Sequence, residues 1–349
     1  MSMELHELYS RVAAAISSLN YADIWPGFTP LKFALYNEEK CLFDGAYIEK
    51  SEDFCANTSI VYQGEQIAIW HIADDLPIPV LTSKIVHEMF HGYQALQHWN
   101  CWADETEALF RYSYNAENLS LKLRENALLL RFLERPDEAA CRELLSLRKL
   151  RSEKFPYAYT YESKVEEIEG TATYVEWMVL RQLDEQAAAA MTRRMRAAVT
   201  KPASLFPIRI SCYYSGALLV NALIRSGIYA FTAERPVACS IVKTVCPSDG
   251  DFPGKESICR MVSEAIASFE RESAQIVRSA REKNELVADG PLELLGVNIY
   301  DARFYQRYIT SKFFLLYRDG KGENTLSGHF VIEMADKKTI ARVYRWEPF

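Results

Sequence analysis

Two histidines separated by three residues, with a glutamate directly after the first, constrain this chain more than any other feature. The segment His87-Glu88-Met89-Phe90-His91 is a complete His-Glu-x-x-His motif. Side chains four residues apart lie on one face of a helix, so both imidazoles can reach one Zn²⁺ ion. The glutamate then lies beside a water bound to that ion and can act as general base. The motif therefore predicts a helix that carries two ligands and the base of a zinc hydrolase.

The surrounding residues have the pattern of an amphipathic helix over about residues 82–98. Thr82 or Ser83, after Pro77 and Pro79, is a suitable N-cap. The histidines fall on the polar side of this helix, opposite an apolar stripe at helical spacing. The stripe consists of Ile85, Val86, Met89, Phe90, Tyr93 and Leu96. We therefore expect a helix that packs by one face and presents the histidines on the other.

A catalytic zinc ion needs a third protein ligand and keeps one position open. The extended motif His-x-x-Gly-x-x-His would supply a third histidine. Here Gln94 and Gln97 occupy the glycine and histidine positions, and His98 comes one residue too late. A glutamate from a later helix is the other common source, and the sequence favours it.

The segment over about residues 162–183 is the candidate for that helix. Its apolar residues recur at helical spacing, and Glu169 and Glu176 lie seven residues apart on another face. Residues 168–176 are Ile-Glu-Gly-Thr-Ala-Thr-Tyr-Val-Glu. This resembles the second motif of the aminopeptidase N-like family of gluzincin metallopeptidases, Asn-Glu-Gly-x-Ala-x-Tyr-x-Glu, at every fixed position except the leading Asn. The small residues at 170–173 would also let this helix pack closely against the first.

The resemblance implies roles for three residues. Glu169 would be the third zinc ligand, and Glu176 would hold a zinc-bound imidazole in its orientation. The family also has Tyr-x-x-Gly-Ala at the start of a later helix, where the tyrosine donates to the oxyanion of the tetrahedral intermediate. The segment Tyr213-Tyr214-Ser215-Gly216-Ala217 matches this pattern. Tyr213 is thus the implied donor, and Tyr214 is the alternative.

Two departures limit the resemblance to the zinc-site segments. Residues 92–168 separate the two motifs here, whereas roughly twenty residues separate them in the family. The family's Gly-x-Met-Glu-Asn motif, which binds the free amine of a substrate, is absent from this chain. The resemblance therefore supports gluzincin chemistry and does not support aminopeptidase specificity.

The long separation leaves other carboxylates as candidate third ligands, although most charges on such helices belong to a solvated face. These candidates are Asp104, Glu105, Glu107 and Glu117, with Glu166 and Glu167 closer to Glu169. The helices of residues 101–160 are expected to wall one side of the cleft. Their lining candidates are Trp102, Phe110, Tyr112 and Tyr114.

Charge and composition exclude some partners. The formal net charge is −7, which argues against nucleic acid because phosphate binding needs a basic patch. The local cationic cluster Arg193-Arg194-Met195-Arg196 is expected to be a solvated helix face. The eight cysteines form no Cys-x-x-Cys pair, and the first residues lack a signal-peptide pattern, so we expect reduced, mostly buried thiols in a cytoplasmic protein. No stretch is long and apolar enough for a membrane span, and the oligomeric state stays open.

The chain is expected to have an α+β fold in two parts. Residues 1–290 would form a zincin-like catalytic domain, with a small sheet over about residues 31–75 followed mainly by helices. In gluzincins the strand before the metal helix is the sheet edge on which extended substrate lies, and residues 66–72 would be that strand here. Residues 291–349 would form a small, accessory β module.

The sequence as a whole predicts a zinc-dependent metallopeptidase acting on peptides or small amides. His87, His91 and Glu169 would hold Zn²⁺, Glu88 would activate water, and Tyr213 would stabilise the oxyanion. A zinc hydrolase of a non-peptide amide or ester is an alternative, because the motifs fix water activation and not the acyl group. A non-catalytic binding or regulatory protein that keeps zinc is another. An intact Glu88 argues against the latter, since structural zinc sites have four protein ligands.

Overall fold

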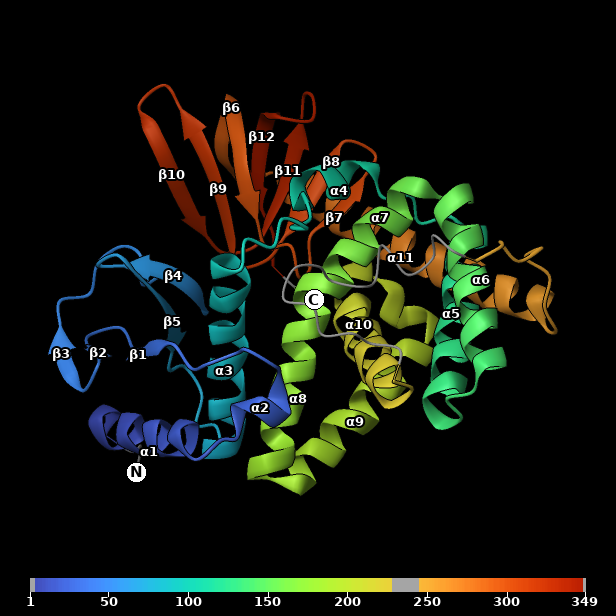
Figure 1. Cartoon of the computed structure of the whole chain (residues 1–349). Coiled ribbons are helices and arrows are strands. Elements are labelled where there is room, and N and C mark those ends of the chain that lie inside the picture. Colours follow the sequence, from blue (N-terminus) through green and yellow to red (C-terminus); the bar gives the residue numbers. More distant parts are fainter. Residues whose placement is uncertain (1–3, 228–244, 348–349) are drawn as a thin grey trace.

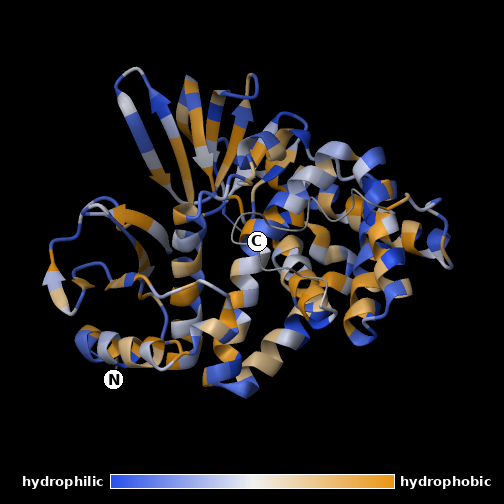
Figure 2. Cartoon of the chain, in the orientation of Figure 1, coloured by the Kyte–Doolittle hydropathy of each residue, from blue (hydrophilic) through white to orange (hydrophobic). Residues whose placement is uncertain are grey.

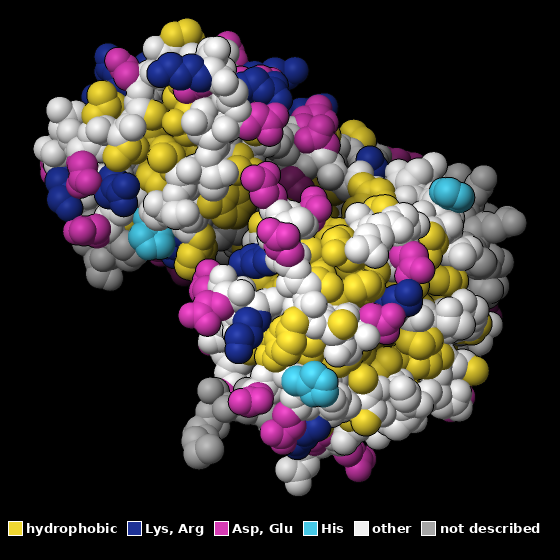
Figure 3. All heavy atoms as spheres, turned by 90° about the vertical axis from the view of Figure 1, so that its left-hand side faces the viewer, with side chains coloured by type: hydrophobic (Ala, Val, Ile, Leu, Met, Phe, Trp, Pro, Cys, Tyr) yellow, Lys and Arg dark blue, Asp and Glu magenta, His cyan; other side chains and the backbone are white. Residues whose placement is uncertain are grey.

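The computed structural model describes residues 4–227 and 245–347, and its regular structure falls into three parts (Figure 1). A small mixed sheet with two helices comes first, a helical body follows, and a larger antiparallel sheet ends the described chain. The protein is thus a mixed α and β structure, as the sequence predicts. On the face shown in Figure 3, the surface is hollowed between the lobes that contain the two sheets.

The N-terminal sheet has the strand order β3-β2-β1-β5-β4. β1 and β5 run parallel in its centre, and the other neighbouring strands are antiparallel. The elements of this part are α1 (Leu5–Ser17), α2 (Tyr21–Ile24), β1 (Lys32–Tyr36), β2 (Cys41–Phe43), β3 (Ala46–Ile48), β4 (Thr58–Tyr62) and β5 (Glu65–His71). The expectation that the strand before the metal helix forms the sheet edge is wrong, because β4 is the edge strand on that side.

The apolar residues of β5 explain why this strand lies inside the sheet. Ala68 belongs to the core that the sheet shares with the helices. Ile67 and Ile69 point to the other face and pack with Tyr36 and Phe54. A strand that is apolar on both faces must be covered on both.

The metal helix α3 spans Ile78–Leu96 and begins earlier than expected. Pro77 is its N-cap residue, and a proline also occupies its first turn, where the missing N–H has no cost. Thr82 and Ser83, the expected N-caps, are buried inside the helix. Gly92 lets the helix approach the N-terminal sheet closely, since a Cβ there would lie 2.7 Å from the Ser59 hydroxyl.

The helical body consists of α4 to α11 and two short turns of other helix types. Side chains of Asp104, Asn115, Asp137 and Asp184 cap four of its helices by accepting backbone N–H bonds. The elements are α4 (Glu105–Arg111), α5 (Ala116–Glu134), α6 (Glu138–Lys154), α7 (Pro156–Val165), the π-helical turn η1 (Glu166–Gly170), α8 (Thr171–Leu183), α9 (Glu185–Thr200), the 3₁₀ turn η2 (Pro202–Leu205), α10 (Ile208–Arg225) and α11 (Lys255–Lys283).

Two glycines fix how closely η1 approaches α10. A Cβ on Gly170 would lie 2.6 Å from Cα of Gly216, and a Cβ on Gly216 would lie 2.6 Å from the backbone oxygen of Glu166. The small residue at 170 was expected to allow close packing against the metal helix. Its close contact is instead with α10, and this contact gives a packing reason for the glycine in the Tyr-x-x-Gly-Ala segment.

The C-terminal sheet has seven antiparallel strands in the order β10-β9-β6-β12-β11-β8-β7. It begins at Leu286, slightly before the expected boundary at 291. The strands are β6 (Leu286–Val297), β7 (Arg303–Tyr305), β8 (Tyr308–Ser311), β9 (Phe314–Asp319), β10 (Gly322–Ser327), β11 (Phe330–Met334) and β12 (Thr339–Arg345). α11 packs against its β7, β8, β11 and β12 strands, and Phe110 of α4 contacts Phe304 edge to face, 4.9 Å between ring centroids.

Hydrophobic and hydrophilic residues alternate along most helices and strands (Figure 2), as expected for elements that pack by one face. Within the described residues, no helix has both the length and the apolar character needed to cross a membrane. The seven cysteines in the described part of the chain are free thiols. Only Cys41, Cys141 and Cys212 are buried, so the expectation of mostly buried thiols is wrong. Cys239 lies outside the described residues.

Candidate metal centre

Three side chains predicted to bind a metal converge on one point. The Nε2 atoms of His87 and His91 lie 3.1 Å apart. Glu169 Oε2 lies 3.2 Å from His91 Nε2 and 3.7 Å from His87 Nε2. A tetrahedral zinc ion with bonds of about 2.0–2.2 Å holds its ligand atoms about 3.3–3.6 Å apart. The three atoms therefore lie close to the spacing that such an ion requires. Within the described residues, they form the one group of three or more His, Cys, Asp or Glu side chains that could hold a metal ion.

The two helical segments supply these ligands by different means. On α3, the four-residue spacing places both histidines on the same face. Glu169 lies in η1, where one turn of π-helix interrupts the continuous run from α7 to α8. A π turn changes the direction of the side chains that follow it, and such turns are frequent at functional sites.

Each histidine has a partner for its second ring nitrogen. His87 Nδ1 lies 3.3 Å from Glu176 Oε2, the contact that the family resemblance implies. His91 Nδ1 lies 2.8 Å from Gln94 Oε1. Since an amide oxygen only accepts, His91 donates through Nδ1 and keeps Nε2 free for a metal. Gln94 is itself held by hydrogen bonds from its amide nitrogen to Ile168 O and Thr171 Oγ1, both 2.9 Å.

Arg209 holds the other oxygen of Glu169. Its Nη2 donates to Glu169 Oε1 at 2.6 Å, and its other terminal nitrogen pairs with Glu105. Burial would raise the pKa of Glu169, but His91, His87 and Arg209 hold it well below its usual range. The carboxylate is thus ionised and oriented with one oxygen toward the histidines. Sequence reasoning missed Arg209, whose position four residues before Tyr213 is its only signal.

The carboxylates next to the ligands lie in different surroundings. Burial would raise the pKa of Glu176, but the contact with His87 and the charges of Lys84 and Arg194 lower it to about 2. Burial raises the pKa of Glu88, and the adjacent histidines oppose the rise. In the described part of the chain, no cationic side chain forms a salt bridge with Glu88.

Two cavities meet at the ligands and form the halves of one cleft. One, of about 330 Å³, extends along the start of β4 to Trp102. The other, of about 240 Å³, extends between α3, α9 and α10. His87, Glu88 and Tyr300 line both. The predicted general base therefore borders both halves of the cleft.

Two tyrosines from distant parts of the chain face each other in this cleft. Tyr213 of α10 donates its hydroxyl hydrogen to Tyr300 at 3.3 Å and accepts from Arg209 at 3.2 Å. Tyr213 and its alternative Tyr214 both line the smaller half. Tyr300 lies in the loop between β6 and β7, so the C-terminal sheet, expected to be accessory, contributes to the cleft. Sequence reasoning missed Tyr300. It did not predict β6 or β7, the strands on either side of this residue.

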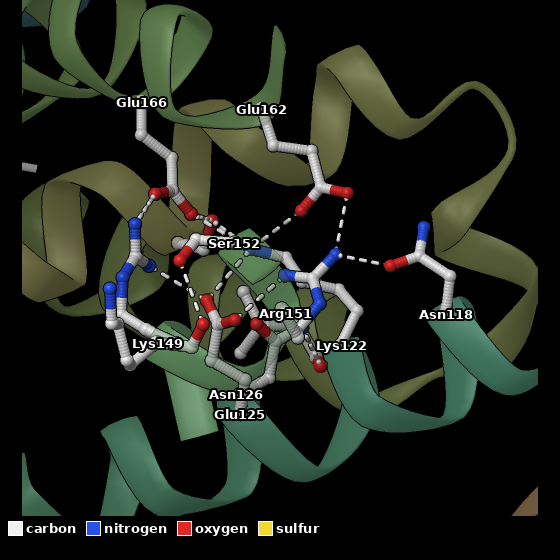
Figure 4. Close-up of polar contacts among 12 residues, drawn as sticks. Asn118, Lys122, Glu125, Asn126, Lys149, Arg151, Ser152, Glu162 and Glu166 are labelled. Carbon is white, nitrogen blue, oxygen red and sulfur yellow. Dashed lines mark hydrogen bonds and ion pairs between the residues drawn. The ribbon is translucent and has the colours of Figure 1, made fainter. Parts of the chain in front are cut away.

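The other candidate ligands are engaged elsewhere. Asp104 caps α4, Glu105 pairs with Arg209, Glu107 pairs with Arg111, and Glu117 pairs with Lys154. Glu167 is buried but is not part of the ligand group. Glu166 belongs to a buried ionic cluster that consists of Lys122, Glu125, Arg148, Arg151, Glu162 and Glu166 (Figure 4).

The helical insertion contributes one of its four expected lining residues to the cleft. Trp102 lines the larger half, with its ring centroid 6.0 Å from that of His91. Phe110, Tyr112 and Tyr114 line another cavity, of about 310 Å³, between α4 and the C-terminal sheet. The prediction for these three was wrong, because Phe110 packs on Phe304 of the C-terminal sheet, and Tyr112 and Tyr114, which follow α4, pack on Tyr161 and Phe206.

Comparisons of this chain with protein-family models, with curated proteins and with solved structures find no match. The site is therefore described by its own geometry. That geometry comprises three convergent ligand atoms, an oriented partner for each of them, and a glutamate beside them in an open cleft.

Proposed function

We propose that this protein is a zinc-dependent metallopeptidase of the gluzincin type, with a zincin-like catalytic part. The observation that carries the proposal is the convergence of His87, His91 and Glu169 with Glu88 beside them in the cleft. Two histidines and one glutamate are a ligand set of catalytic zinc sites, and three protein ligands leave a fourth position for a reactant.

The side chains around the ligands have separable roles in hydrolysis. A bound zinc ion would polarise the scissile carbonyl and make water more acidic. Glu88 would take a proton from the attacking water and deliver it to the leaving amine. Tyr213 would donate to the developing oxyanion, and Arg209 would hold both Tyr213 and Glu169 in place. Tyr300 lies within hydrogen-bond distance of Tyr213 and is a second candidate donor.

An edge strand beside the metal centre favours a peptide over other acyl substrates. β4 is paired on one side only, and Thr58 and Ser59 at its start line the same cavity as His91. An extended peptide can pair with the free edge of such a strand through its backbone. A compact amide or ester has no backbone to form these bonds.

Metal analysis and hydrolysis assays of the full chain test the proposal. We expect about one zinc ion per chain, and His91→Ala should lose most of it, because one of three ligands is removed. His98→Ala, which changes an exposed histidine near the end of the same helix, is the matched control. Zinc retention by His91→Ala equal to that of the control would contradict the assignment.

The substrate class is tested with N-acetylated and free-amine versions of one peptide library, beside simple amides and esters. Hydrolysis of N-acetylated peptides is expected, because no amine-binding motif is present. Hydrolysis of the small amides or esters alone would replace the peptidase proposal by the non-peptide alternative. A strict requirement for a free amine would reveal an amine site that the sequence does not show.

A further inference from the structure

The smaller half of the cleft contains cationic side chains that the proposed chemistry does not use. Lys84 of α3 and Arg194 of α9 line it together with His87 and Glu88. Arg194 belongs to the cationic cluster that was expected to be only a solvated helix face. It is exposed to solvent, but it also borders the cavity that contains the predicted general base.

The two cations differ in how far they are neutralised. Lys84 Nζ lies 3.5 Å from Glu176 Oε1, and the other oxygen of Glu176 faces His87. Arg194 has no carboxylate within 4.0 Å among the described residues, whereas its neighbour Arg196 pairs with Glu134. The guanidinium of Arg194 is thus the cation in this half of the cleft that is left to bind an external anion.

One aromatic ring lies beside the guanidinium of Arg194, and apolar side chains line part of the rest of the cavity. Its guanidinium carbon lies 5.9 Å from the centroid of the Tyr214 ring, within the range of a cation–π contact. Trp70 and Met191 also line this half. A planar guanidinium fixed against a ring suits a carboxylate, which it can bind through two parallel hydrogen bonds.

We propose that Arg194, assisted by Lys84, binds a carboxylate of the substrate next to the scissile bond. The inference rests on the proposed peptidase function and names its substrate class as peptides with a carboxylate on the side of the cleft between α3, α9 and α10. The carboxylate is either the C-terminus of the peptide or an Asp or Glu side chain. Both present the same planar anion, and the larger half of the cleft beside β4 takes the rest of the chain.

The first test measures hydrolysis by the zinc-loaded full chain. The substrates are N-acetylated peptides with a free or an amidated C-terminus, each with Asp or Glu, or with Asn or Gln, at the positions flanking the cleaved bond. We expect faster cleavage of one acidic form. Arg194→Gln should raise KM for that form on the order of tenfold or more, because a charge-assisted hydrogen bond is lost, and should change kcat little. Arg193→Gln, an exposed neighbour that does not line the cavity, should behave as wild type.

The arms of this test separate the two sources of the carboxylate. A preference for the free over the amidated C-terminus indicates a carboxypeptidase-like mode. A preference for Asp or Glu over Asn or Gln that persists with an amidated C-terminus indicates a side-chain pocket. Equal cleavage of acidic and neutral forms, or a preference that survives in Arg194→Gln, overturns the inference while leaving the peptidase proposal intact.

Binding to the Glu88→Gln protein keeps the inference testable if no peptide is cleaved. Calorimetric titration of zinc-loaded Glu88→Gln with the same acidic and neutral peptides should show tighter binding of an acidic form. Addition of Arg194→Gln should abolish that difference. Tighter binding without hydrolysis by wild type would refute the peptidase proposal and keep the carboxylate site. Equal binding of acidic and neutral peptides would refute the site.

Discussion

The metal centre and the ionic cluster behind it use carboxylates from the same helical run, α7 with η1 and α8. In the ionic cluster, Glu162 and Glu166 are joined by Glu125, and three cations face these three carboxylates at 2.7–3.4 Å. Lys122, Arg148 and Arg151 are those cations, and all are almost completely buried. The protein itself supplies the whole of the neutralising charge there.

The metal centre lacks this balance. Glu88, Glu169 and Glu176 line the cleft there. Among the described residues, Lys84 pairs with Glu176, Arg209 is shared between Glu169 and Glu105, and Glu88 has no Lys or Arg partner. Its carboxylates are therefore less completely paired with cations than those of the ionic cluster. Burial would lower the pKa of His87, but the surrounding carboxylates raise it to about 10, so a proton on this ring supplies positive charge there when no metal is bound. Metal binding must then displace that proton.

The comparison indicates different roles for Glu166 of the ionic cluster and Glu88 of the cleft. Glu166 accepts from Lys122, Arg148 and Ser215, so loss of its charge would leave buried cations without one of their partners. Glu88 forms no salt bridge with a Lys or Arg side chain among the described residues and lies in a cleft beside the ligand histidines, so loss of its charge would break no such pair. A carboxylate that is costly to the fold and unpaired is expected at a catalytic position.

The largest effect is expected for Glu88→Gln. Turnover should fall about 10²–10⁴-fold, because general-base catalysis contributes on that order. Zinc content and the free energy of unfolding should be unchanged or slightly increased, since the substitution keeps the shape and removes an unpaired charge. Hydrolysis at near wild-type rates would refute the role of Glu88, and loss of zinc would place this residue among the ligands.

Glu166→Gln makes the same chemical change in the ionic cluster and should have the opposite result. Removal of one partner from a buried ion pair typically costs about 3–5 kcal/mol of unfolding free energy. Denaturant unfolding of the metal-free protein measures it. Glu117→Gln is the matched control, because it breaks an exposed pair with Lys154 and should cost about 0–1 kcal/mol. Equal losses in the two variants would show that burial of the cluster is not what makes it stabilising.

The cluster also predicts how the fold responds to acid. Burial would raise the pKa of Glu125, but Lys122, Arg148 and Arg151 lower it to about 2. A carboxylate with a lowered folded-state pKa contributes stability above its ordinary pKa of 4.5, and that contribution is lost as the pH falls toward 2. Unfolding free energies of wild type and Glu125→Gln should therefore converge between pH 4.5 and 2. A constant difference across that range would contradict the lowered pKa.

Gly170→Ala tests whether the close contact of η1 with α10 sets the position of Glu169. The added Cβ would lie 2.6 Å from Cα of Gly216, and backbone atoms cannot rotate aside. Overpacking of this kind typically costs about 1–3 kcal/mol, and displacement of η1 should weaken zinc binding as well. Gly320→Ala, where a Cβ would meet nothing within 4 Å, is the control. Unchanged zinc affinity in a destabilised Gly170→Ala would show that the contact supports only the fold.

The sequence was sufficient for the elements whose signals are local. The metal helix, the strand β5 before it and the helices of the insertion follow from periodicity, prolines and turn residues. The turn that joins β4 to β5 has positive φ at Gln63 and Gly64, 51° and 83°, as a two-residue connection requires. The convergence of Glu169 with the histidines was predicted from a motif, although the 77 residues 92–168 separate Glu169 from His91.

What the sequence could not supply are contacts between distant segments. Glu105 was considered as a ligand, but its carboxylate forms an ion pair with Arg209, which lies more than a hundred residues later in the chain. Tyr300 reaches the cleft only because the C-terminal sheet packs beside the helical body, and no local pattern encodes that arrangement. Arg194 had the pattern of a solvated helix face and is exposed, yet it lines the same cavity as the predicted base.

Gln94→Ala is expected to have the smallest effect and tests the orientation of His91. Gln94 accepts from His91 Nδ1 at 2.8 Å and links this ring to the backbone of η1. Loss of such a partner typically lowers metal affinity about 10–100-fold, and the lower end applies here because one of two histidines is affected. Competition with a zinc chelator measures the change, with Gln97→Ala, an exposed glutamine after the last turn of α3, as the control. Equal zinc affinity in the two variants would show that the helix alone orients His91 and that the hydrogen bond from Gln94 is not needed for metal binding.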